Sequence, residues 1–133
     1  MPSCEIDVDG CPKFLLLVKR LRAKYPTIGR DLEDAFEKIE PDYATAAGAA
    51  TIPGWEGIVW RHRCGNSDMQ ASGDGFRIIS VVVRDRASHV LYPVLIYPEA
   101  DQPDPTGVEV AAAVRALERE LKTLQDNEPS TLR

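Results

Sequence analysis

The chain has 133 residues, which is the usual size of one domain and enough to bury a core without disulfide or metal staples. Its apolar fraction of 44% and charged fraction of 28% are ordinary for a globular protein. No stretch approaches the roughly 20 apolar residues that a membrane-spanning helix needs, and the early apolar run 14–18 is too short for a signal peptide. We therefore expect a single cytoplasmic domain over residues 1–125, followed by a disordered tail over 126–133.

The charges of the chain are segregated along its length. The net charge of −5 argues against a general nucleic-acid binder. Residues 12–30 nevertheless contain only basic charges, residues 31–42 are acidic, and the middle of the chain is rich in arginine: Arg61, Arg63, Arg77, Arg84 and Arg86. A local basic surface can therefore exist on an acidic protein.

The first part of the chain predicts a short strand followed by two helices. Polarity alternates over residues 4–8, which indicates a strand. Apolar residues at helical spacing predict a helix over 12–25 that ends at Pro26. Thr27 is a candidate N-cap for a second helix, whose apolar stripe runs from Ile28 to Ile39. The short loop between the helices predicts a helical hairpin.

The middle of the chain changes to a period of two, which predicts three antiparallel strands over residues 57–63, 76–84 and 90–97. Pro93 lies inside the third strand and indicates a sheet edge or a bulge, because proline donates no ladder hydrogen bond.

Alternation along residues 57–63 separates two sets of side chains. Ile58, Trp60 and His62 should point to one side of the sheet, and Val59, Arg61 and Arg63 to the other. His62 titrates near neutral pH and would be a natural acid–base group, but this alternation removes it from the arginine side.

The three cysteines of the chain are an odd number and are expected to be free thiols in a cytoplasmic protein. One of them, Cys64, could be combined with His62 and His89 into a zinc site. The spacing fits no common zinc module, so we expect no metal, a buried thiol and two surface histidines.

The C-terminal part predicts a long helix. Thr106 stands three residues before Glu109, which is a capping-box pattern. The apolar period after it predicts a helix of roughly 17 residues, with the stripe Val110, Val114, Leu117, Leu121 and Leu124. This stripe either packs on the chain's own sheet, or forms a homodimer seam or a contact with a partner protein.

Four strings in this order resemble the RelE/ParE superfamily of type II toxin–antitoxin toxins, above all the RelE-like messenger-RNA interferases. They span roughly residues 12–100: Leu21-Arg22-Ala23-Lys24-Tyr25-Pro26, Ile52-Pro53-Gly54 leading into Trp60-Arg61-His62-Arg63, Gly75-Phe76-Arg77-Ile78-Ile79, and Leu95-Ile96-Tyr97. The resemblance implies an α+β, RelE-like fold: an N-terminal helical hairpin packed on a twisted antiparallel β-sheet. The C-terminal helix is added to it.

The resemblance also implies an activity. Such toxins enter the ribosomal A site and cut messenger RNA as endoribonucleases, without a metal or another cofactor. The RNA's own 2′-hydroxyl attacks the adjacent phosphate, while protein side chains hold that phosphate and move protons. The implied partners are a cognate antitoxin protein and messenger RNA on the ribosome, with no membrane.

The family pattern points to particular side chains. Arg77 matches an arginine that binds phosphate in RNA-cleaving relatives, and Arg61 matches a basic position of the preceding strand. The catalytic candidates are Arg61, Arg77 and Tyr97, and the RNA-phosphate candidates are Arg61, Arg63, Arg77, Lys19 and Arg22. Arginine suits the task because its planar fork grips two phosphate oxygens. Alternatively, these are surface arginines paired with nearby acids, and Tyr97 is an aromatic at the edge of the core.

Three acids depart from the family pattern. Asp74 lies in a glycine-rich loop where relatives carry a lysine, and Glu99 and Asp101 follow the last strand where relatives often carry lysine or arginine. A carboxylate near an RNA phosphate repels it. The alternatives are therefore a binding protein of the same fold that has lost catalysis, and a gyrase-directed toxin of the ParE branch.

Overall fold

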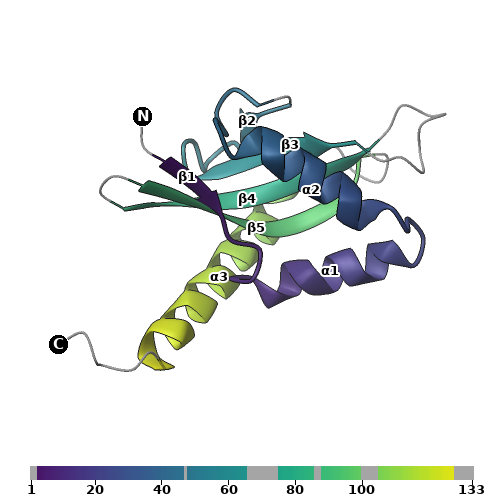
Figure 1. Ribbon diagram of the computed structural model, residues 1–133. Coiled ribbons are helices and arrows are strands. Elements are labelled where there is room, and N and C mark those ends of the chain that lie inside the picture. Colours follow the sequence, from purple (N-terminus) through teal and green to yellow (C-terminus); the bar gives the residue numbers. More distant parts are fainter. Residues whose placement is uncertain (1–2, 47, 66–74, 86–87, 100–104, 128–133) are drawn as a thin grey trace.

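The computed structural model describes residues 3–46, 48–65, 75–85, 88–99 and 105–127, and these residues form an α+β fold. In the described part of the chain, three helices flank a five-stranded mixed sheet. Helices α1 and α2 lie on one side of the sheet and α3 lies on the other (Figure 1). The elements are β1 (Ser3–Ile6), α1 (Pro12–Arg22), α2 (Ile28–Ile39), β2 (Ala50–Thr51), β3 (Val59–Cys64), β4 (Phe76–Asp85), β5 (Ser88–Pro98) and α3 (Gly107–Asn127).

The strand order across the sheet is β1-β5-β4-β3-β2. Strands β3, β4 and β5 pair antiparallel, as the sequence predicts. The short strand β2, which the sequence does not predict, pairs antiparallel with β3, and β1 pairs parallel to the first part of β5. The expectation of an antiparallel sheet is therefore wrong at this edge, and the sheet is mixed. Alternating polarity identifies a strand, but it does not set the direction in which the strand pairs.

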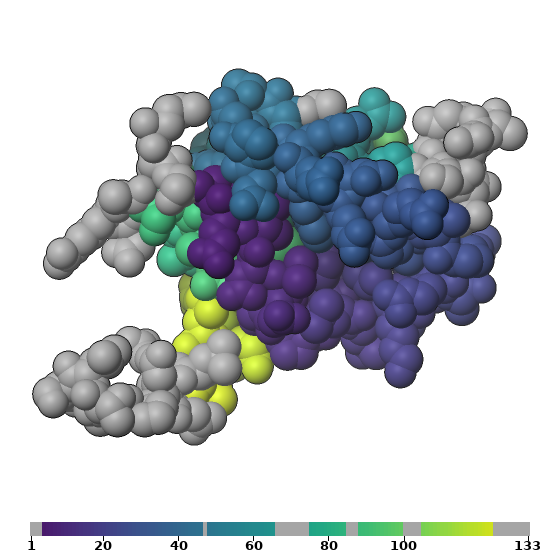
Figure 2. All heavy atoms as spheres, in the orientation of Figure 1, coloured from purple at the N-terminus to yellow at the C-terminus, as the bar shows by residue number. Residues whose placement is uncertain are grey.

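The helical hairpin covers one face of the sheet with its apolar stripes. Phe14 and Val18 of α1 are buried there, as are Ile28 and Leu32 of α2. The two helices and β1 together form the near surface in Figure 2. Helix α1 ends three residues earlier than predicted, at Arg22.

In the turn between the two helices, Thr27 does not make the capping hydrogen bond that the sequence predicts. Thr27 occupies the N-cap position of α2, but its hydroxyl donates to the carboxylate of Asp31 at 3.1 Å and makes no capping bond to the backbone. The ring of Tyr25 packs edge-on against Phe76 at 5.1 Å between centroids. This contact places the end of α1 over the start of β4.

Pro93 lies at a β-bulge in β5. Ile79 pairs with Leu95 and Ser80 pairs with Pro93, so Val94 is an extra residue without its own partner on β4. The predicted bulge is confirmed. Strand β5 lies between β1 and β4, but its second half, which contains Pro93, pairs in the described part of the chain with β4 alone. The proline is tolerated here because the pairing with β1 ends at Leu91.

Helix α3 begins with the predicted capping box and packs on the chain's own sheet. The backbone N–H of Thr106 donates to Glu109 Oε1 at 2.9 Å, and that of Glu109 donates to Thr106 Oγ1 at 3.1 Å. The first turns of the stripe are buried against the face opposite the hairpin: Val110, Ala113, Val114 and Leu117. The helix is longer than predicted and includes residues 126 and 127, while 128–133 lie outside the described residues.

Candidate functional site

Three of the predicted site residues form a row across the three central strands, near one end of the sheet. Arg63 of β3 pairs directly with Arg77 of β4, and Arg77 pairs directly with Tyr97 of β5. Directly opposed residues project from the same face of a sheet. Phe76 packs on the hairpin side, so its neighbour Arg77 projects from the opposite face. We call Arg63, Arg77 and Tyr97 the cross-strand row.

Arg61 belongs to the same face but not to this row. It lies two residues before Arg63 on β3 and pairs with Ile79 of β4. The period of two therefore brings Arg61 and Arg63 to one side, as the sequence predicts. Arg61 is half-buried, whereas the side chain of Arg63 is 55% exposed.

The other two phosphate candidates lie in a different layer. Lys19 and Arg22 are exposed on α1, on the hairpin side of the sheet. Because Tyr25 contacts Phe76, the end of α1 lies at the same end of the sheet as the cross-strand row. The sheet separates the two groups, so the structure does not gather all five predicted cations into one cluster.

The carboxylate of Glu99 bridges the two arginines of the row. Its Oε1 accepts a hydrogen bond from Arg77 Nη2 at 3.0 Å, and its Oε2 accepts one from Arg63 Nη2 at 3.2 Å. The Arg77 side chain is 15% exposed and that of Glu99 is 22% exposed. The hydrogen bond from Arg77, aided by the charges of both arginines, holds the pKa of Glu99 below its ordinary value.

Two glycines allow the row to form, and sequence reasoning did not assign them this role. A Cβ on Gly75 would lie 2.3 Å from the carbonyl oxygen of Cys64, so only glycine lets β4 begin so close to the end of β3. A Cβ on Gly48 would lie 2.3 Å from Cγ of Arg63, so the arginine stem occupies the space that a side chain would fill. Gly48 also has a φ of +75°, which favours glycine.

The backbone of Glu99 is held at the same place. Its N–H donates to the carbonyl of Gly75 at 2.9 Å. The carboxylate therefore starts from a fixed point beside the first residues of β4. Asp74 and Asp101, the other two acids that depart from the family pattern, lie outside the described residues.

His62 lies on the hairpin side, as alternation predicts, but it is fully buried and not at the surface as expected. Its Nε2 lies 2.6 Å from the carbonyl oxygen of Tyr43, and its ring stacks on Trp60. Burial lowers the pKa of His62, and the bond to Tyr43 offsets part of that effect. Tyr43 lies in the chain after α2, so this segment packs on the hairpin side of β3.

The three residues that could be combined into a zinc site, His62, His89 and Cys64, each have other surroundings in the structure. His89 is half-buried, and its Nδ1 lies 2.7 Å from the hydroxyl of Tyr43. Cys64 is buried as expected, and burial, with the nearby charges of Asp31 and Asp34, raises the pKa of its thiol to about 12. In the described part of the chain, no group of three or more His, Cys, Asp or Glu side chains could hold a metal ion.

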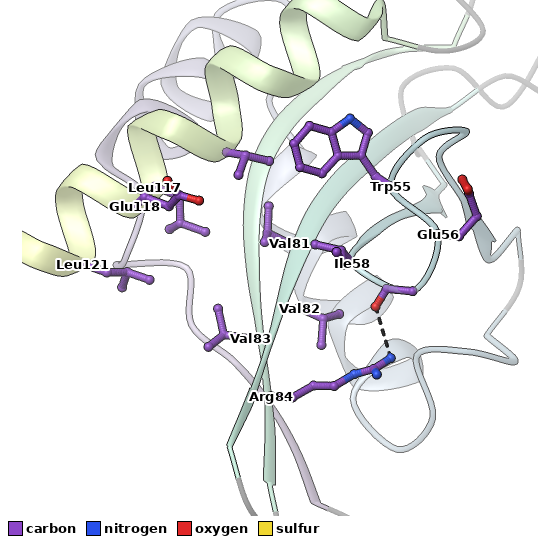
Figure 3. Close-up of a pocket in the computed structure, with 12 residues that line it drawn as sticks. Trp55, Glu56, Ile58, Val81, Val82, Val83, Arg84, Leu117, Glu118 and Leu121 are labelled. Carbon is purple, nitrogen blue, oxygen red and sulfur yellow. Dashed lines mark hydrogen bonds between the residues drawn. The ribbon is translucent and has the colours of Figure 1, made fainter.

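A cavity of about 480 Å³ lies between α3, β4 and the turn before β3 (Figure 3). Its walls are mainly apolar and include Ile58, Val81, Val83 and Leu121, and Arg84 donates to the carbonyl of Gly57 at its rim. Ile58 and Val83 are exposed large apolar residues. Sequence reasoning missed this cavity, because its walls come from three separate segments.

No protein-family model, curated protein or solved structure matches the chain. None of the helices in the described ranges is long and apolar enough to cross a membrane.

Proposed function

We propose that the chain is the RelE-like toxin of a type II toxin–antitoxin pair, acting in the cytoplasm as a ribosome-dependent messenger-RNA endonuclease. The observation that carries the proposal is the cross-strand row. Two guanidinium groups and one phenol lie side by side on neighbouring strands, on one face and at one end of the sheet. Phosphodiester cleavage without a metal needs cationic groups that hold the phosphate and a group that donates a proton.

The chemistry assigns a role to each member of the row. The RNA 2′-hydroxyl gives its proton to solvent while its oxygen forms a bond to phosphorus. The bond from phosphorus to the 5′-oxygen breaks, which leaves a 2′,3′-cyclic phosphate and, after protonation of the leaving oxygen, a 5′-hydroxyl. Arg63 and Arg77, with Arg61 beside them, hold the phosphate oxygens and stabilise their growing negative charge. Tyr97 suits the role of proton donor to the leaving 5′-oxygen, because a phenol hydroxyl can act as a general acid. Lys19 and Arg22 would contact RNA outside the row.

Induced expression in a bacterium that lacks the partner protein tests this function. We expect growth arrest and new messenger-RNA ends, both of which Arg77→Ala should remove. Arg115→Ala is the matched control, because Arg115 is an exposed arginine on α3 and does not belong to the row. Co-expression of the antitoxin should restore growth. Normal growth and intact messenger RNA with the unchanged chain would contradict the proposal.

One observation favours a second candidate, a RelE-fold binding protein that has lost catalysis. Glu99 places a carboxylate on the two arginines that would hold the phosphate. This candidate predicts a stable complex with a small partner protein and no RNA cleavage on the ribosome. Cleavage that Arg77→Ala abolishes would reject it. A homodimer through α3 would have to use other surface than the buried start of its stripe.

A further inference from the structure

The Glu99 carboxylate binds the two arginines in the way that an anionic ligand would bind them. One of its oxygens accepts from Arg77 and the other accepts from Arg63. A phosphodiester presents two non-bridging oxygens that can be shared between two guanidinium groups in the same way. The side chain of Glu99 therefore occupies the position that a bound phosphate would need.

We propose that Glu99 is a built-in competitor for this site, whose carboxylate must rotate away before an RNA phosphate binds Arg63 and Arg77. This inference rests on the proposed function in one respect, which is that the phosphate-bearing ligand is RNA. The competition itself follows from charge, because a carboxylate and a phosphate at the same two guanidinium groups repel each other.

The anchoring of Glu99 is suited to such a rotation. Its backbone N–H is bound to Gly75, so the chain need not move when the side chain does. Its carboxylate reaches solvent, and its partner Arg63 is more than half exposed. The ion pair with Arg63 is therefore weak. The contact with Arg77, whose side chain is 15% exposed, is the stronger one that an incoming phosphate has to replace.

The displacement changes the charge that the site presents. With Glu99 in place, its carboxylate offsets one of the two guanidinium charges, so the three side chains together carry one positive charge. With Glu99 turned away, the two arginines act on the ligand without it. Removing the carboxylate should therefore raise the affinity of the site for phosphates.

The test is binding of a fluorescein-labelled dodecauridylate RNA to the full chain, measured by fluorescence anisotropy in about 50 mM salt, where phosphate contacts are strongest. We expect Glu99→Gln and Glu99→Ala to bind roughly tenfold more tightly than the unchanged chain. Glu118→Gln is the control, because it removes the same charge from an exposed site on α3. It should change the affinity by less than about twofold.

A second pair of variants assigns the gain to the site. Arg77→Ala and Arg63→Ala, each added to Glu99→Gln, should remove the gain, while circular dichroism checks that each variant is folded. Equal or weaker binding by Glu99→Gln would overturn the inference, and so would a gain that survives both arginine substitutions. Messenger-RNA cleavage is a separate readout, so its absence would count against the proposed function and leave the binding result intact.

Discussion

Arg63 lies directly opposite Arg77 across β3 and β4, on one face of the sheet. Like charges that face each other across strands destabilise a sheet unless a counter-charge is present. Glu99 supplies that charge from the residue after β5. The same carboxylate thus stabilises the folded chain and occupies the candidate phosphate site.

The stability contributed by Glu99 should depend on pH. Its pKa is lower in the folded chain than its ordinary value of 4.5, so its contribution is present above 4.5 and is lost as the pH falls through the folded value. We expect Glu99→Gln to lower the free energy of unfolding by less than about 1 kcal/mol near neutral pH, because the pair is partly exposed. Urea unfolding at about pH 6 and about pH 3.5 should show this difference shrinking in acid. A difference that is equal at both pH values would contradict the ion pair.

His62 should add a second pH dependence, centred higher. Its pKa is lowered in the folded chain from an ordinary value of 6.5, so the unfolded chain binds its proton first. The stability linked to neutral His62 is therefore present above 6.5 and is lost as the pH falls below that value. In urea unfolding, the unchanged chain should lose more stability between about pH 7.5 and about pH 5.5 than His62→Gln does. Parallel losses in the two chains would show that His62 is not the group responsible.

Gly75→Ala should destabilise the chain by about 2 kcal/mol, because the new Cβ would overlap the carbonyl of Cys64 and force β3 and β4 apart. Gly65→Ala is the matched control: no atom in the described part of the chain lies within 4 Å of its ideal Cβ. Thermal unfolding of both variants gives the comparison. If the two substitutions have equal effects, the close approach at Gly75 does not hold the row in place.

The sequence predicts local features of this chain well, because they depend on neighbours. The period of two places Arg61 and Arg63 together and away from His62, and the capping box at Thr106 forms as its spacing indicates. The pairing of Arg63 with Arg77 and of Arg77 with Tyr97 depends on strand register. No local pattern specifies that register. The four strings that resemble the toxin family suggest that these residues lie near one another, but they do not give the register.

The contacts that sequence reasoning missed join distant residues. Glu99 is 22 residues from Arg77 and 36 residues from Arg63 in the sequence. The sequence predicts Glu99 as an acid that repels RNA and leaves open that the arginines pair with nearby acids, but it does not identify Glu99 as their partner. His62 is buried because Tyr43, 19 residues earlier, supplies its hydrogen-bond partner. The parallel direction of β1 is set by its pairing with β5, more than 80 residues later, as for Ser3 and Ser88.

The most direct test of the proposed function is messenger-RNA cleavage in a cell-free bacterial translation reaction, read by mapping new 5′ ends. The unchanged chain should cut a translated message and spare the same message when ribosomes are omitted. Arg77→Ala should cut it about 100-fold more slowly, and Arg115→Ala should cut it as fast as the unchanged chain. A message that stays intact on ribosomes with the unchanged chain would contradict the assignment of Arg63, Arg77 and Tyr97 to RNA cleavage.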